Sequence, residues 1–376
     1  MGTHDHWKAQ IREAARAAGF ALCGFARLET PPHAAFVRGW LDAGNQAGMS
    51  YLDKGLAKRL DPRLILASAR SIVSLGYRYL PPPLPAIDWQ AELRGRIAAY
   101  AFGGDYHRIL EDKLGALADV VRGLGAGIEV KRSVDVGAVL EREWASLSGV
   151  GWFGKNTNIL HTAEGSYFFL GELITNLDFD SDAASADHCG TCTRCLDLCP
   201  TGALQPGYVL DARLCISFWT IEHRGAIPPS LRPCLGNWIF GCDVCQEVCP
   251  WNDKLGREPE AEAAALQPFL PDLLRLDDEE FRARYRRSAI WRVKRDGFVR
   301  NVAVALANTA NPDAVPYLAA ALHSDPSARV RSHAAWGLGR LGGARAGEGL
   351  RHARSRETDA GVLAEIDAAI GECCRS

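Results

Sequence analysis

The order of apolar and polar residues in the first half of the chain predicts a mixture of helices and strands. Residues 1–20 repeat apolar positions with the period of an amphipathic helix, and residues 108–125 read as a helix that ends at glycine. The segment 69–80 has the β-branched core of a buried strand, and the segment 165–177 is also strand-like. These patterns together predict an α+β domain.

Beyond residue 255 the pattern changes to helices that are rich in alanine and arginine. A shift of 32 residues aligns Ala303 with Ala335 and Leu306 with Leu338. Such a repeat indicates helical hairpins of the HEAT type, in which neighbouring units bury faces that neither could bury alone. With a cysteine-rich section between the two patterns, the sequence predicts three domains, at residues 1–180, 181–255 and 256–376.

Two cysteine-rich runs carry the clearest chemistry of the chain. The first, HCGTCTRCLDLCPTGAL at 188–204, spaces its cysteines by three, three and four residues and closes with Cys199-Pro200. This is the bacterial ferredoxin run, which binds a [4Fe–4S] cube. The second run, GCDVCQEVCPWN at 241–252, has Ile239 where its first ligand should stand. Two cubes need eight thiolates, so the two runs are one cysteine short.

The ferredoxin pattern also predicts which cysteines share a cube, because the last cysteine of each run ligates the other cluster. One predicted cube takes four thiolates, from Cys189, Cys192, Cys195 and Cys249. The other takes Cys199, Cys242 and Cys245. For its fourth ligand the spacing leaves both Cys215 and Cys234 open. A pair of zinc sites is the alternative, since zinc also binds CxxC pairs, but the repeated Cys-Pro ending favours the cubes.

The composition is that of an ordinary soluble protein, with 47% apolar and 23% charged residues. The formal net charge is only −2, so any surface that binds a polyanion must be local. No stretch approaches the roughly 18–20 uninterrupted apolar residues of a membrane span, and the N-terminus has no apolar signal-peptide core. Most of the twelve cysteines have metal-ligand spacing, which favours a reducing compartment over disulfides. We therefore expect a cytoplasmic protein without membrane attachment.

One local concentration of charge is present. The segment 282–300 carries seven arginines and one lysine against a single aspartate, which predicts a phosphate-binding stripe. Its candidate phosphate contacts are Arg292, Lys294, Arg295 and Arg300, with Arg331 as an extension. Tyr285, Trp291 and Phe298 could stack on bases, although aromatic residues at this spacing also pack helical cores. A solvated basic face is the alternative for the whole segment.

The segment Asp105-Tyr106-His107 resembles the D-x-H start of the motif that supplies a histidine to cobalamin. The glycine that this motif requires is replaced by Leu110, so His107 is predicted to be a helix-start residue that forms local hydrogen bonds. No GxGxxG after a strand and no GxxxxGK[ST] occurs in the sequence, so nucleotide-binding domains of those kinds are not indicated.

Taken together, five segments resemble the epoxyqueuosine reductases: SVDVGAVLEREWASLSGVGWFGKNTNIL, the first cysteine run, DARLCISFWTIEHRGAIP, the second cysteine run and SHAAWGLGRLG. The resemblance covers nearly the whole chain. It implies an α+β, nitroreductase-like cobalamin domain, a ferredoxin-like domain with two [4Fe–4S] clusters and C-terminal helical HEAT-like repeats. The implied reaction is the reduction of epoxyqueuosine to queuosine at the wobble position of tRNA. The resemblance also selects Cys215 rather than Cys234 as the eighth ligand.

The same resemblance implies roles for single residues. Asp135 matches the proton donor of the family, and its apolar neighbours would raise its pKa. The alternative is a turn aspartate that caps a helix at 137–146. The residues implied to lie around cobalamin are Arg59, Asp135, Lys155, Asn156, Thr157, Ser217 and Thr220. An external flavodoxin or ferredoxin system is the implied electron donor. The competing functions are a dehalogenase-like reductase of small molecules and an electron-transfer protein.

Overall fold

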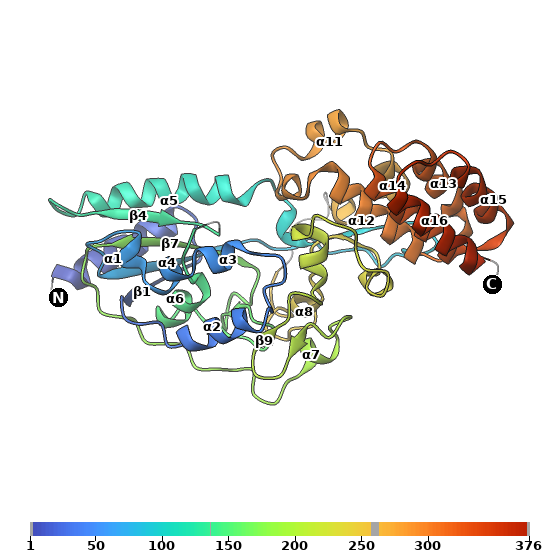
Figure 1. Ribbon diagram of the computed structural model, residues 1–376. Helices are drawn as coiled ribbons and strands as arrows, with labels where there is room; N and C mark the ends of the chain where they lie inside the picture. Colours follow the sequence, from blue (N-terminus) through green and yellow to red (C-terminus); the bar gives the residue numbers. More distant parts are fainter. Residues whose placement is uncertain (1–2, 136, 257–262, 374–376) are drawn as a thin grey trace. The chain divides into compact units, whose positions relative to one another are not determined.

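A computed structural model describes residues 3–135, 137–256 and 263–373 (Figure 1). The chain forms two compact units. The first, called the sheet unit, consists of Met1–Leu80, Asp105–Arg213 and Val244–Arg257. The second, called the repeat unit, consists of Pro81–Gly104, Leu214–Asp243 and Glu258–Ser376. The cysteine-rich section does not form a unit of its own, so the domain boundaries predicted at 180 and 255 differ from the boundaries of these units.

The sheet unit is built on one antiparallel sheet of four strands in the order β1-β2-β7-β4. The strands are β1 Leu22–Arg27, β2 Ser71–Arg78, β7 Phe168–Thr175 and β4 Val130–Ser133. The two central strands, β2 and β7, come from the two segments that read as strands in the sequence, so that prediction is confirmed. Each is mostly buried on both faces, because helices cover both sides of the sheet.

Two long helices cover one face of this sheet. They are α1 Thr3–Ala17 and α5 Tyr106–Arg122, the two helices predicted from their periodic patterns. Their apolar sides form one core with Phe25, Val73 and Leu173 of the sheet. The opposite face packs against the short helix α6, Glu141–Leu147, through Trp144.

Helix α6 lies very close to the sheet. At Gly24 of β1 a Cβ atom would lie 2.1 Å from the backbone oxygen of Ser148, directly after α6. Only glycine permits this approach, so the distance between α6 and the sheet is set by the backbone.

The rest of the sheet unit consists of short elements. The helices are α2 Ala34–Asp42, α3 Tyr51–Lys54, α4 Leu56–Leu60, α7 Arg194–Asp197 and α8 Val244–Glu247. The short strand pairs are β5 Trp152–Phe153 with β6 Ile159–Leu160, and β8 Leu204–Gln205 with β9 Val209–Leu210. Both cysteine runs therefore lie mainly in turns, with α7 and α8 at equivalent positions of the two runs.

In the ranges that the structure describes, the repeat unit is mainly helical and contains one parallel strand pair, β3 Arg96–Ile97 with β10 Trp238–Phe240. Its first helices are α9 Ala263–Leu266, α10 Leu270–Leu274 and α11 Asp278–Tyr285. The repeats follow as α12 Lys294–Asn308, α13 Val315–Ser324, α14 Ala328–Leu341, α15 Gly343–Arg354 and α16 Ala360–Cys373. Ala303 of α12 and Ala335 of α14 are both fully buried, as the sequence repeat predicts. Within the described ranges, no helix is long and apolar enough to cross a membrane.

Candidate active site

Asp135 lies directly after β4, in a loop whose backbone is held in an uncommon conformation. Its φ angle of 44° is in the left-handed region, where residues other than glycine are rare and where strain often marks a functional site. The side chain is 42% exposed. Its Oδ2 atom accepts a hydrogen bond of 2.7 Å from the hydroxyl of Tyr106 and lies 2.9 Å from Nε2 of His107. The carboxyl group is therefore accessible and has a fixed orientation.

Tyr106 and His107 form the first turn of α5, which Asp105 caps by accepting the backbone N–H of His107. The Nδ1 atom of His107 also lies 2.8 Å from Asp105 Oδ1. The prediction of a helix-start histidine with a local hydrogen bond is therefore confirmed. No pattern in the sequence indicates the second contact, to Asp135, because the two residues are 28 positions apart.

The two carboxylates affect the protonation of this histidine. Burial alone would lower the pKa of His107. The hydrogen bonds and charges of Asp135 and Asp105 outweigh burial and raise this pKa above its ordinary value. The raised pKa favours the protonated imidazole, and a histidine–carboxylate pair of this kind is a suitable arrangement for acid catalysis.

Two further acidic residues, which the sequence patterns did not reveal, interact with Asp135. Glu141, the first residue of α6, accepts the backbone N–H of Asp135. Burial and the charge of Asp135 raise the pKa of Glu141 to about 7. Glu172, in the middle of β7, is fully buried.

The N-cap of α6 is Leu140, so the alternative in which Asp135 caps this helix is wrong.

Arg59 supports the other side of the Asp135 loop. Its Nη1 atom donates to the backbone oxygens of Gly137 and Val139, both at 3.3 Å. Its Nε atom is buried and has no hydrogen-bond partner among the residues that the structure describes. A buried arginine N–H group without a hydrogen-bond acceptor is compatible with a polar ligand at this position.

The four cysteines of the first predicted cube lie together in the sheet unit: Cys189, Cys192, Cys195 and Cys249. Burial raises the pKa of Cys195 to about 11, and the charges of the other three thiols add to this rise. Trp152 and Leu160 pack against two of these cysteines. Four soft donors that influence one another suit the ligand set of an iron–sulfur cube. Within the described part of the chain, no three His, Cys, Asp or Glu side chains form a site for a single metal ion.

The glycine-rich loop between β5 and β6 connects to both cysteine runs. Lys155 Nζ donates to the backbone oxygens of Gly190, at 2.7 Å, and Cys192, at 2.9 Å. The buried Asn156 donates through Nδ2 to the backbone oxygen of Cys245 at 3.1 Å. Thr157 follows in the left-handed region with a φ angle of 63°. The loop predicted to contact cobalamin therefore also holds the loops that carry cluster ligands.

The cysteines of the second predicted cube are divided between the units. Cys199 and Cys245 belong to the sheet unit, and Cys215 and Cys242 belong to the repeat unit, so their common cube stays a prediction. Burial opposes ionisation of Cys199, but three backbone N–H groups that donate to its sulfur lower its pKa below the ordinary value.

The predicted cofactor contacts Ser217 and Thr220 also belong to the repeat unit, around the π-helix at Phe218–Glu222. The hydroxyl of the buried Thr220 donates to the backbone oxygen of Ile216 and accepts the N–H of Gly241. The hydroxyl of Thr220 thus forms its hydrogen bonds within this unit.

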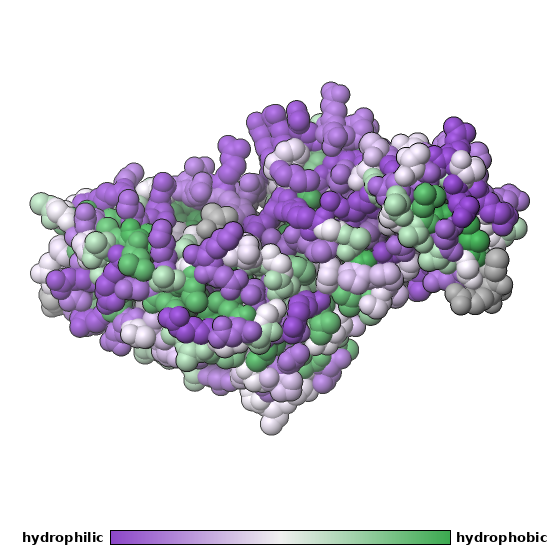
Figure 2. Space-filling model, in the orientation of Figure 1, coloured by the Kyte–Doolittle hydropathy of each residue, from purple (hydrophilic) through white to green (hydrophobic). Residues whose placement is uncertain are grey.

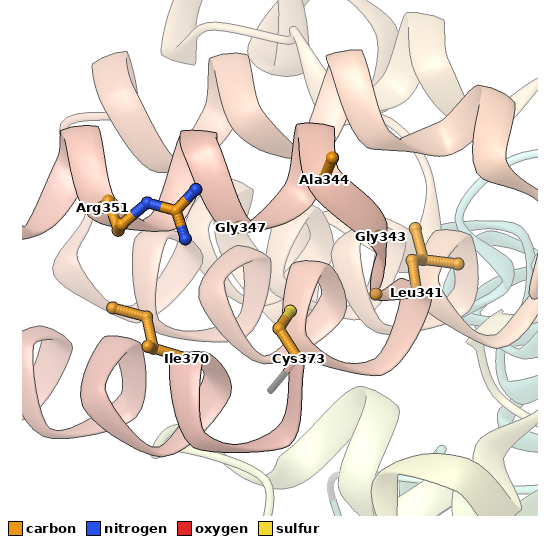
Figure 3. Close-up of a pocket in the computed structure, with 8 residues that line it drawn as sticks. Leu341, Gly343, Ala344, Gly347, Arg351, Ile370 and Cys373 are labelled. Carbon is orange, nitrogen blue, oxygen red and sulfur yellow. The ribbon is translucent and has the colours of Figure 1, made fainter. Parts of the chain in front are cut away.

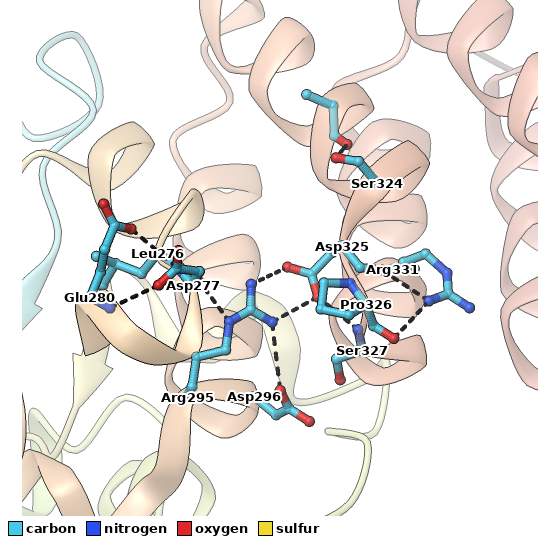
Figure 4. Close-up of polar contacts among 11 residues, drawn as sticks. Leu276, Asp277, Glu280, Arg295, Asp296, Ser324, Asp325, Pro326, Ser327 and Arg331 are labelled. Atoms are coloured by element: carbon cyan, nitrogen blue, oxygen red, sulfur yellow. Dashed lines mark hydrogen bonds and ion pairs between the residues drawn. The ribbon is translucent and has the colours of Figure 1, made fainter. Parts of the chain in front are cut away.

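The prediction for the arginine-rich segment is wrong at Arg295 and Arg300, which are buried, and stays a prediction at the other three residues. Arg295 is buried and forms hydrogen bonds of 2.8 Å to both Asp325 Oδ1 and the backbone oxygen of Leu276 (Figure 4). Arg300 is fully buried and donates to three backbone oxygens. Arg331 is mostly buried against Glu357, at 2.7 Å. These guanidinium groups stabilise the repeat unit, and a phosphate could not reach Arg295 or Arg300.

The aromatic residues of the segment also have a structural role. Tyr285 and Phe298 pack against each other and against Phe281, and Trp291 stacks on Phe281. These contacts support the core interpretation, and Phe298, which is fully buried, cannot stack on a base. The exposed cations of the segment are instead Arg282, Arg284, Arg286, Arg287 and Lys294. Figure 2 shows that hydrophilic residues cover the surface around α11, from which the first two of them project.

The repeat unit also contains an open pocket at the ends of α14, α15 and α16 (Figure 3). Leu341, Arg351 and Cys373 contribute to its lining, and none of the residues singled out in the sequence for a function does so. The pocket thus lies apart from the candidate chemistry.

Comparison with known proteins first defines the class of this chain. Residues 188–252 match the family described as "4Fe-4S double cluster binding domain", and residues 298–371 match "HEAT repeats". The chain is thus an iron–sulfur protein with a HEAT-repeat region. Residues 59–136, which end directly after Asp135, match "Epoxyqueuosine reductase QueG, DUF1730".

Similarity over the full length defines the family. The chain is 38% identical over 341 residues to an epoxyqueuosine reductase of Xanthomonas campestris pv. campestris, covering 89% of this chain and 96% of that protein. The corresponding protein of Pseudomonas aeruginosa is 37% identical over 340 residues, with coverages of 88% and 94%. The chain therefore belongs to the epoxyqueuosine reductase family.

Solved structures agree with this assignment. An epoxyqueuosine reductase crystallised with an epoxyqueuosine-modified tRNA stem loop superimposes with a TM-score of 0.90 at 33% identity, covering 98% of this chain and 99% of that chain. A Bacillus subtilis epoxyqueuosine reductase, described with its aspartate catalytic loop swung out of the active site, gives the same values. The α+β fold with iron–sulfur and HEAT regions is thereby confirmed.

Proposed function

We propose that this chain reduces epoxyqueuosine to queuosine at the wobble position of tRNA, with Asp135 as the proton donor. The observation that carries the proposal is the orientation of Asp135 by Tyr106 and His107 in a chain that matches epoxyqueuosine reductases over nearly its whole length. Conversion of an epoxide to an alkene consumes two electrons and two protons and releases water. The site must therefore supply both.

The first proton comes from the pair formed by Asp135 and His107. Asp135 is the more exposed partner, with 42% of its side chain accessible against 22% for His107, so it faces the substrate. As the carbon–oxygen bond of the epoxide breaks, Asp135 transfers its proton to the oxygen and prevents the build-up of alkoxide charge. His107 then stabilises the carboxylate that remains.

Cobalamin fits the residues that surround Asp135. The buried Nε atom of Arg59, which holds the Asp135 loop, has no partner within the described residues, and an amide of a corrin could satisfy it. Arg59, together with Lys155, Asn156 and Thr157 of the glycine-rich loop, would hold the cofactor. Bound cobalamin would supply electrons to the epoxide carbon. We include Ser217 as a further contact, whereas Thr220 would contribute only through its backbone.

The two predicted [4Fe–4S] clusters, held by the cysteines of the two runs, would supply the electrons. Lys155 and Asn156 link the cofactor loop to Cys192 and Cys245, one residue of each cysteine run. We assign one cube to Cys189, Cys192, Cys195 and Cys249, and the other to Cys199, Cys215, Cys242 and Cys245. An external donor such as a flavodoxin or ferredoxin system would reduce the clusters, in the cytoplasm where tRNA is available.

Exposed cations of the repeat unit would bind the tRNA backbone. Arg282, Arg284, Arg286 and Arg287 are exposed, unlike the buried arginines that follow them. Phosphate contacts position the RNA without reading its sequence, and the enzyme would take the modified base out of its stack at a cost of a few kcal/mol.

The substrate is tested with the holoenzyme, reconstituted anaerobically with iron, sulfide and cobalamin. It is given epoxyqueuosine in tRNA, the free epoxyqueuosine nucleoside, or a halogenated phenol as a dehalogenase substrate. We expect conversion of the modified tRNA and little or none of the two small molecules. Preferential turnover of the halogenated phenol would instead assign the chain to the dehalogenase-like alternative.

A further inference from the structure

A row of three buried polar side chains crosses the sheet below α6. In the antiparallel registers, Ser74 of β2 lies opposite Glu172 of β7, and Glu172 lies opposite Ser133 of β4. Directly opposed residues share a face, with Cβ atoms about 4.5–5.5 Å apart. This is the face covered by α6. Lys131, two positions before Ser133 on the same face, is exposed and lies outside the buried row.

None of the groups in this row has a hydrogen-bond partner among the described residues. This holds for both carboxyl oxygens of Glu172, for the hydroxyls of Ser74 and Ser133, and for Nε1 of Trp144, which α6 directs toward the sheet. The relative exposure of Glu172, Ser74 and Trp144 is 0%. Buried polar atoms are normally satisfied, and a charged carboxylate without partners is far costlier to bury than a neutral acid. Glu172 is therefore a protonated acid in the folded protein.

Glu172 is connected electrostatically to the catalytic aspartate. The charges that act on Glu172 belong to Glu141 and Asp135, and they favour its protonated form together with burial. Glu141 accepts the backbone N–H of Asp135, and its charge acts on Glu172, so it is coupled to both residues. Exposure falls along this series, from 42% at Asp135 to 0% at Glu172.

We propose that Glu172 and Glu141 store the second proton of the reaction and return it to Asp135 after the first proton transfer. The inference rests on the proposed function, in which Asp135 is the donor. The first proton passes from Asp135 to the epoxide oxygen as the carbon–oxygen bond breaks. A proton then moves from Glu141 to the Asp135 carboxylate, and Glu172 reprotonates Glu141.

The second proton leaves Asp135 when the hydroxyl group departs as water, and bound cobalamin and the clusters would supply the two electrons. Solvent restores the proton to Glu172 after product release. In this account Glu172 and Glu141 act through Asp135, so they are positioning and proton-storing residues and do not contact the substrate.

The proposal is tested by a single turnover of the holoenzyme with bound modified tRNA, at pH values from 6 to 9. Glu172→Gln keeps the shape and neutrality of the side chain but cannot release a proton. We expect its rate of queuosine formation to fall about tenfold or more and to decrease more steeply with pH than that of the wild type. Iron content, the cobalamin spectrum and tRNA affinity should not change.

Glu143→Gln is the matched control, because Glu143 is a buried glutamate of α6 that pairs with His33 at 2.7 Å and does not act on Asp135. Its rate should equal that of the wild type. Equal rates in wild type and Glu172→Gln would overturn the proton store. Failure of the wild type itself to form queuosine would instead reject the proposed function.

Infrared spectroscopy provides a second readout that does not depend on the folding of Glu172→Gln. The wild type should show the carbonyl stretch of a protonated carboxyl group at pH 8, and Ser133→Ala should shift this band by changing the environment of Glu172. Absence of such a band at pH 8, or a band that Ser133→Ala leaves unmoved, would also overturn the proposal.

Discussion

His107 Nε2 lies 2.9 Å from Oδ2 of Asp135, although the two residues belong to different elements of the sheet unit, the start of α5 and the loop after β4. Through this contact the exposed Asp135 carboxyl group and the His107 imidazole can share a proton. The fold brings it about by placing α5 and β4 next to each other, with Asp105 fixing the other nitrogen of the imidazole ring.

The hydroxyl of Tyr106 is predicted to matter for turnover and not for folding. Tyr106→Phe removes the 2.7 Å hydrogen bond to Asp135 but keeps the ring, which stacks on Phe169 with centroids 4.2 Å apart. A hydrogen bond to a charged group contributes about 1.5–3 kcal/mol, so we expect turnover to fall about tenfold or more, with little change in the thermal midpoint. A wild-type rate in Tyr106→Phe would show that this hydrogen bond does not orient the acid.

The pair should also make stability depend on pH. The pKa of His107 is raised in the folded state by its carboxylate partners. The stabilisation is therefore fully present below the pKa of an unfolded histidine, about 6.5, and is lost as the pH rises through the higher folded value. We expect the thermal midpoint of the wild type to exceed that of His107→Gln most at about pH 5–6, and the difference to shrink toward pH 9. A difference that grows with pH would contradict the assignment.

The eighth cluster ligand is tested by iron analysis. Ile239 occupies the position where the second cysteine run lacks a ligand, and we assign the missing thiolate to Cys215. Cys215→Ala should lose one cube or convert it to a three-iron form, whereas Cys234→Ala, the matched control, should keep the full iron content. If Cys215→Ala retained both intact cubes, the eighth ligand would have to be another residue.

Exposed and buried arginines of the repeat unit should respond differently to substitution. Alanine at Arg282, Arg286 and Arg287 should weaken tRNA binding and reduce the log–log salt slope by about 0.7–0.9 for each phosphate that is no longer neutralised. Arg16→Ala, which removes an exposed cation of α1, is the control and should leave the slope unchanged. Arg295→Ala should instead lower the free energy of unfolding by about 3–5 kcal/mol, because it leaves Asp325 buried and unpaired. An unaltered slope in the triple variant would place the RNA on another surface.

Features of the fold that depend on local pattern could be predicted from the sequence. The apolar period of α5, the β-branched run of β2 and the repeat in which Ala303 and Ala335 are both buried can each be recognised from local sequence. The cysteine runs were equally readable, because the spacing of cluster ligands is a property of one loop.

The partners of single charged residues could not be read in the same way. An arginine-rich segment is compatible with a basic surface or with buried caps of backbone oxygens, and only the packing of α12 shows that Arg295 and Arg300 are of the second kind. Likewise, the opposition of Glu172 to Ser74 and Ser133 depends on strand register across three distant segments. The roles of these charged residues depend on contacts between segments that are distant in the sequence, and the residue type alone does not indicate them.

The central claim is tested most directly by comparing wild type and Asp135→Asn in one measurement. Both holoenzymes are incubated with reduced cobalamin and epoxyqueuosine tRNA in a single turnover, and the nucleosides are analysed by mass spectrometry. We predict that the wild type converts epoxyqueuosine to queuosine, with loss of one oxygen atom, and that Asp135→Asn binds both ligands but reacts about 10²–10⁴ times more slowly. Queuosine formation at the wild-type rate in Asp135→Asn, or none in the wild type, would contradict the account.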